Sequence, residues 1–178
     1  MLCVWLFAQL GEHFSPIHAG LTLMAMVIGM IAGMGAGFAL AGRLGRHLLH
    51  VGVAIVAVGT VVLALAVTGV QTASTWDLAP GLFLIGLGAG ASMGQLFDFI
   101  LAGVGMDEVG SASGVLETVQ QLSSALGVAA LGTIFFSAFE GHLPTHALAI
   151  TAWACLVPLA ATFLLVFRLP MHARQPQL

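Results

Sequence analysis

Charged residues are scarce in this chain. Only four Lys or Arg and seven Asp or Glu occur among its 178 residues, so charged residues make up 6% of the chain and hydrophobic residues 60%. A soluble protein needs a hydrophilic exterior around its core, and so few charges cannot cover a globule of this size. The shortage of charge therefore argues against a soluble domain and favours a protein that lies in lipid.

Basic character is lacking as well. The formal net charge is −3, and the chain has no Lys-rich segment and no pattern of aromatic residues for stacking on bases. These absences exclude nucleic acid as an expected partner. The two cysteines, Cys3 and Cys155, both lie in apolar runs and indicate no disulfide.

Long stretches carry no Asp, Glu, Lys or Arg at all. They include residues 14–42, 47–76, 118–139 and 141–167. Each exceeds the roughly 20 apolar residues that a helix needs to cross a bilayer. A transmembrane β-barrel would instead show segments of about 10 residues with alternating polarity, and none occurs. The sequence thus predicts an all-α, multi-pass membrane protein whose first partner is the lipid bilayer.

Charged, Gly, Pro and His-rich residues divide the chain into five predicted spans. These are residues 17–41, 49–70, 78–104, 111–139 and 146–167. Residues 1–10 supply about 15 Å of helix, half of a crossing, and we interpret them as the truncated end of a sixth helix. A signal peptide would need a basic start and a cleavage pattern of small residues, which this segment lacks. We expect a fragment with a transmembrane domain over 11–167 and a tail over 168–178.

The arginines predict the orientation. Arg43 and Arg46 follow the first predicted span, and Arg168 and Arg174 follow the fifth. Four spans separate the two pairs, so both pairs lie on one side, which the positive-inside rule assigns to the cytoplasm. We therefore expect a plasma-membrane protein with a cytoplasmic C-terminus and with Trp76 in the outer interfacial belt.

No metal or cofactor site and no enzyme active site is expected. Two histidine pairs have the spacing of metal ligands on a helix: His142 with His146, and His47 with His50. Apart from Glu140, no Cys or carboxylate completes either pair, so solvated histidines are favoured. Residues 110–114, Gly-Ser-Ala-Ser-Gly, are not a nucleophile elbow, because the central residue is Ala112.

Glycine recurs at every fourth position in two predicted spans. The positions are Gly29, Gly33 and Gly37 in the first span, and Gly86, Gly90 and Gly94 in the third. Such faces let helices approach closely. They fit contacts that slide or rock in a transporter, and they equally fit ordinary tight packing.

A methionine stripe accompanies the first glycine face. Opposite that face we expect Met26, Met30 and Met34 to form a flexible, polarisable surface. It would either line a pocket for varied apolar ligands or fill the core between helices.

Two acidic residues lie inside predicted spans. Glu117 lies about two turns into the fourth span, and Gln120, Gln121 and Ser124 follow it at helical spacing. A carboxylate in hydrocarbon costs several kcal/mol, so this polar stripe indicates a face turned toward an aqueous path, with Glu117 as a proton carrier. A hydrogen-bond network between helices is the alternative. Asp98, in the third span, is a second proton-coupling candidate unless it reaches the cytoplasmic interface.

Several segments share the motifs of one transporter family. They are residues 9–16 with 19–21, residues 41–47 (Ala-Gly-Arg-Leu-Gly-Arg-His), residues 80–82 with 86–90, and residues 109–114 with Thr118, Gln120, Gln121 and 125–132. In this order they resemble the major facilitator superfamily, and within it the 14-helix drug/proton antiporters of the EmrB/QacA type. The second segment is similar to the cytoplasmic loop signature, carried here by Arg43, Gly45 and Arg46.

The resemblance implies a function and also shows departures. It covers the last five helices and part of the one before, approximately the second half of a transporter that holds its substrate between two halves. Gly42 stands where the signature normally has Asp, and Glu117 stands where many relatives have Asn. The resemblance implies proton-coupled efflux of drugs or small organic metabolites, with the missing N-terminal half or another copy as partner. The alternative is a non-transporting module, or a half-transporter that assembles with a separate half.

Overall fold

The computed structural model describes residues 2–11, 15–70, 72–101, 104–105, 108–139 and 143–168. Its elements are α1 (Leu2–Leu6), the π-helical turn η1 (Phe7–Gly11), α2 (Pro16–Leu44), α3 (Arg46–Val67), α4 (Thr75–Leu101), α5 (Val109–Phe139) and α6 (Pro144–Val166). The described residues contain no strand. The predicted all-α fold, five full helices preceded by a short helical piece, is confirmed.

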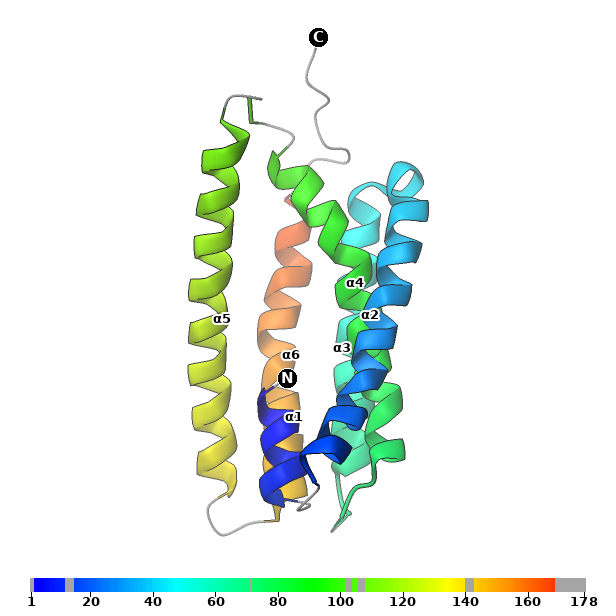
Figure 1. The fold of residues 1–178 in the computed structure, drawn as a ribbon, viewed down its shortest axis with the longest axis vertical. Coiled ribbons are helices and arrows are strands. Elements are labelled where there is room, and N and C mark those ends of the chain that lie inside the picture. The colour runs from blue at the N-terminus through cyan, green and yellow to red at the C-terminus, as the bar shows by residue number, and fades with distance from the viewer. Residues whose placement is uncertain are drawn as a thin grey trace.

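Five helices are long and apolar enough to cross a membrane. The qualifying segments are Ile17–Gly42, Arg46–Val67, Thr75–Phe97, Val109–Phe139 and Pro144–Val166. They run side by side along the long axis of the molecule, while α1 and η1 extend along only its lower part (Figure 1). This arrangement is that of a multi-pass membrane protein.

Local sequence determines where α2 begins and ends. Ser15 caps its start by accepting a hydrogen bond from the His18 amide at 3.3 Å, and Pro16 fills the first helical position. The helix ends at Gly45, whose φ of 49° lies in the left-handed region that glycine adopts readily. Because Gly45 also begins the next helix, Arg46 is the first residue of α3.

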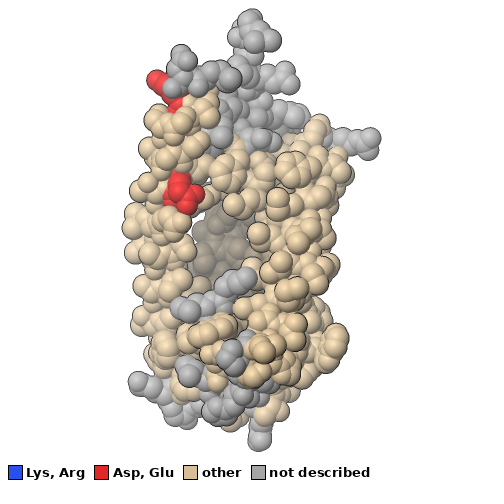
Figure 2. All heavy atoms as spheres, in the orientation of Figure 1, with Lys and Arg blue, Asp and Glu red and all other residues tan. Residues whose placement is uncertain are grey.

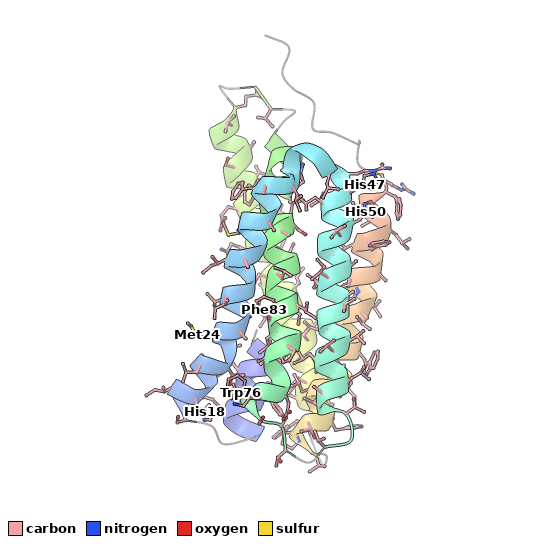
Figure 3. All side chains as sticks on the ribbon, turned by 90° about the vertical axis from the view of Figure 1, so that its right-hand side faces the viewer. His18, Met24, His47, His50, Trp76 and Phe83 are labelled. Atoms are coloured by element: carbon pink, nitrogen blue, oxygen red, sulfur yellow. The ribbon has the colours of Figure 1, made fainter. Side chains whose placement is uncertain are left out.

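Helix α4 lies between α2 and α3 (Figure 3). On the α2 side, a Cβ added at Gly29 or Gly33 would overlap the backbone of α4, and one added at Gly86 or Gly90 would overlap the backbone of α2. On the α3 side, a Cβ at Gly59 would lie 2.9 Å from the carbonyl oxygen of Gly81. Glycine thus brings three helices into backbone contact.

The apolar core gathers at the end of the bundle where η1 lies. Its largest fully buried side chains include Phe7, Leu78, Leu82, Phe135 and Leu148, which come from η1, α4, α5 and α6. Within α5, only Gly132 and Phe135 are buried. Helix α5 is therefore held near its C-terminal end, and most of its length has no helix packed over it.

Candidate functional site

Four polar residues of α5 form one stripe in the N-terminal half of the helix. Glu117, Gln120, Gln121 and Ser124 follow the helical spacing of a single face. The Gln121 side-chain amide donates a hydrogen bond of 2.8 Å to Glu117 Oε1. Glu117, Gln121 and Ser124 are exposed and Gln120 is half-buried. No other described helix covers this stripe.

A cavity of about 430 Å³ lies beside the stripe. Residues from α1, α2, α3, α4, α5 and α6 line it, and most are apolar, with Thr60 and Thr151 among the few polar ones. Ser124 and Met26 belong to the lining, whereas Glu117, Gln120 and Gln121 do not. Figure 2 shows this face of the molecule hollowed beside α5, with acidic side chains visible on this helix and just above its start. Ser124 thus connects the polar stripe to the cavity.

The methionines lie beside the first glycine face, not opposite it as expected. Met26 and Met30 each precede a glycine of this face by three residues, and positions three residues apart differ by only about 60° around a helix. The carbonyl oxygens of Met26 and Met30 therefore approach Gly86 and Gly90 of α4. Met26 lines the large cavity and Met34 lines a second cavity, while Met30 lines neither. The three side chains therefore do not share one pocket.

Close contact between the glycine faces ends before Gly94. A Cβ there would meet only the Phe38 ring, at 3.6 Å, an ordinary van der Waals distance. Gly37 remains in close contact, since a Cβ there would lie 2.8 Å from the carbonyl oxygen of Ala91. Beyond this point α2 and α4 leave the second cavity between them, with a volume of about 220 Å³.

Gln95 lines this second cavity and was missed by sequence reasoning. Its side chain is only 7% exposed, and its Oε1 atom is buried without a hydrogen-bond partner. The sequence feature that could have indicated Gln95 is the presence of a polar residue within an apolar span. Asp98 continues α4 three residues later, but its side chain lies outside the described part of the structure, as does that of Arg43.

The loop signature is brought to the end of α6. Arg46 Nη1 donates a hydrogen bond of 3.2 Å to the carbonyl oxygen of Phe167, which caps the C-terminus of α6. Arg46 and Arg168 consequently lie at the same end of the bundle. Trp76 is exposed at the opposite end, near His18 (Figure 3).

Among the described residues, no group of three or more His, Cys, Asp or Glu is placed to hold a metal ion. His142 and Glu140 lie outside the described residues. The ring centroids of His47 and His50 are 6.3 Å apart. His50 is buried against aromatic rings whereas His47 is exposed, so the two side chains face different surroundings.

Comparison with known proteins gives one family. Residues 1–128 match the sequence model described as Major Facilitator Superfamily. The chain is 41% identical over 138 residues to the "Probable actinorhodin transporter" of Streptomyces coelicolor, covering 76% of this chain and 24% of that protein. It is 33% identical over 140 residues to the multidrug efflux pump LfrA of Mycolicibacterium smegmatis, covering 78% of this chain and 27% of that protein. The chain spans about a quarter of the length of these curated relatives.

Proposed function

Because the chain belongs to the Major Facilitator Superfamily, we propose that it forms part of the C-terminal half of a proton-coupled exporter of drugs or small organic metabolites. The relatives named above are a transporter and an efflux pump, so the family places the chain among transporters and not among enzymes. Within the superfamily, the 14-helix EmrB/QacA type remains our prediction. We also assign the end that carries Arg46 and Arg168 to the cytoplasm, following the positive-inside rule.

The uncovered polar face of α5 is the observation that carries this proposal. A carboxylate and two amides on a lipid-facing helix would cost several kcal/mol. The cost disappears if a second body covers the face and leaves water between the two. We infer that this body is an N-terminal half, or failing that another copy of the chain, and that the transport path runs between it and α5.

Glu117 supplies the proton step in this proposal. Its Oε1 atom accepts the hydrogen bond from Gln121. Protonation gives a neutral acid, which is less costly to enclose against apolar groups than the anion. Proton binding would therefore favour a state in which the stripe is closed, and proton release a state in which it is hydrated. Ser124 and Met26, in the wall of the large cavity, would contact the apolar part of a substrate.

The test is a chimera in which this chain replaces the matching segment of the Streptomyces coelicolor relative. The assay uses everted membrane vesicles with an imposed pH gradient, in which efflux is measured as accumulation of a fluorescent drug in the vesicle lumen. We expect such accumulation with the parental chimera. The variant Glu117→Gln keeps the hydrogen-bonding shape but cannot ionise, and we expect it to lower gradient-driven efflux at least about tenfold. Membrane insertion should be unchanged.

The matched control is Glu108→Gln. Glu108 is exposed just before α5, and its backbone carbonyl accepts a hydrogen bond from Ser111 at 2.9 Å. We expect this variant to transport within about twofold of the parent, because a solvated loop carboxylate needs no partner. Efflux that keeps its dependence on the pH gradient in Glu117→Gln would contradict the role of Glu117. A chimera that inserts but never transports would favour the alternative, a non-transporting module.

A further inference from the structure

Arg46 interacts with a helix far from it in sequence. It is the first residue of α3, and its guanidinium donates to the carbonyl oxygen of Phe167, 121 residues later, at 3.2 Å. The last carbonyl groups of a helix have no partner within the helix and carry partial negative charge. A guanidinium donor satisfies such a carbonyl with a charge-assisted hydrogen bond. Arg46 thus caps α6.

The position of Arg46 within its own helix is unfavourable. A cation in the first turn of a helix faces the positive end of that helix's dipole. The first turn of α3 also has no acidic residue, and Gly45 provides no side-chain cap. Arg46 is therefore unfavourable for the N-terminus of its own helix, α3, while its interaction with the C-terminus of α6 is favourable. Such a conflict is expected where a residue serves another element.

His50 strengthens the same contact one turn further along α3. His50 is only 9% exposed, and its ring lies edge-on to Phe163 and Phe167, with ring centroids 5.1 and 4.3 Å away. Phe163 and Phe167 also contact each other, at 5.7 Å. His50 Nδ1 lies 3.3 Å from the Arg46 carbonyl oxygen, so that nitrogen carries the hydrogen. Figure 3 shows His50 where α3 and α6 lie side by side.

We propose that Arg46 and His50 form a clasp that fixes the end of α6 to the start of α3, so that the two helices move as one body during transport. The clasp comprises Arg46, His50, Phe163 and Phe167. Its role in transport rests on the proposed function, whereas its effect on α6 does not. Arg46 is thus a positioning residue, which acts on α6 and lies away from the cavity wall.

The first test measures hydrogen exchange of the chain itself in lipid nanodiscs. In Arg46→Met the Phe167 carbonyl loses its charged donor, and we expect the amides of residues 163–168 to exchange about tenfold faster or more. Amides of residues 145–152, at the other end of α6, should not change. Arg46→Lys retains a charged donor for the Phe167 carbonyl, and it should restore slow exchange to within about threefold.

The matched control is Arg168→Met, which removes the same charge from the same end without removing the bond to Phe167. We expect parental exchange in this variant. For the rings, His50→Phe should retain the packing and His50→Ala should accelerate exchange over residues 163–168. Equal acceleration in Arg168→Met and Arg46→Met, or none in Arg46→Met, would overturn the clasp.

The second test uses the transport chimera. We expect Arg46→Met to lower the maximal rate several-fold without changing the substrate KM, because the clasp does not line the cavity, and Arg46→Lys to restore the rate. Faster exchange without any change in rate would make the clasp purely structural and overturn its positioning role. A parental chimera that does not transport would refute the proposed function, while the exchange data would still decide whether the clasp exists.

Discussion

The acceptor of Gln95 is buried without a hydrogen bond, and this has an energetic cost. An unsatisfied buried polar atom typically costs about 1–3 kcal/mol. Methionine has a similar length and no such requirement, so we expect Gln95→Met to stabilise the chain by about 1 kcal/mol. The measurement is unfolding by SDS in mixed detergent micelles.

Leu96→Met provides the control for Gln95→Met, because it introduces the same side chain one position along α4 at an exposed site. Its effect should stay within about 0.5 kcal/mol. A loss of stability in Gln95→Met would show that Oε1 has a partner in the membrane, such as a bound water or a ligand in the 220 Å³ cavity.

At the scale of residues, the sequence predicted some candidate site residues and did not indicate others. Glu117 stood out because a carboxylate in an apolar span is costly wherever it lies, so its type and position were enough. Gln95 did not, because an amide is costly only when it is buried without a partner, and that depends on where α2 diverges from α4. The exposure of Met30 and Met34 likewise depends on the direction from which α4 packs.

At the scale of elements, the contact of α2 with α4 depends on the space that its glycines leave. A Cβ at Gly33 would overlap the Leu87 carbonyl of α4, whereas a Cβ at Gly35 on the same helix would meet nothing within 4 Å. We expect Gly33→Ala to destabilise the chain by about 1–3 kcal/mol, because the two backbones must separate. Gly35→Ala should be neutral, or stabilising by up to about 1 kcal/mol through helix propensity.

SDS unfolding of the two alanine variants, with cross-linking between α2 and α4 as a second measure, distinguishes these expectations. Equal effects of the two substitutions would show that the glycines do not determine the contact. The sequence could predict that the glycine faces pack closely, because a face without side chains serves little else in a membrane. It could not predict that α4 contacts α3 through other glycines than those that contact α2, since a four-residue period does not indicate which helix packs against it.

At the scale of the whole molecule, the helix count followed from length and hydrophobicity, but the open side of the bundle did not. Periodicity shows which face of α5 is polar. Whether that face lies in a crowded core or on a surface depends on how α6 and α1 pack against α5, whose Phe135 is buried near the other end of the helix. Such long-range packing is not encoded in any local pattern. The structure therefore shows that this polar face is exposed, and the exposed face predicts how the isolated chain behaves.

In mild detergent we expect the isolated chain to associate with itself, because polar side chains exposed to an apolar phase seek hydrogen bonds with another copy. The measure is mass by light scattering. The triple variant Glu117→Leu, Gln120→Leu and Gln121→Leu makes the stripe compatible with lipid and should be monomeric. Thr133→Leu should associate like the parent, because the exposed Thr133 hydroxyl already donates to Ala129 of its own helix at 2.8 Å.

Co-expression with the N-terminal half of the Streptomyces coelicolor relative should replace self-association by a one-to-one complex, since both partners would then compete for the same face of α5. The triple-leucine variant should lose this complex as well. If that variant instead retained self-association while the parent still formed the complex, the contact between copies would lie elsewhere on the chain. The polar stripe would then serve the second half alone, and the second copy would be excluded as the body that covers it.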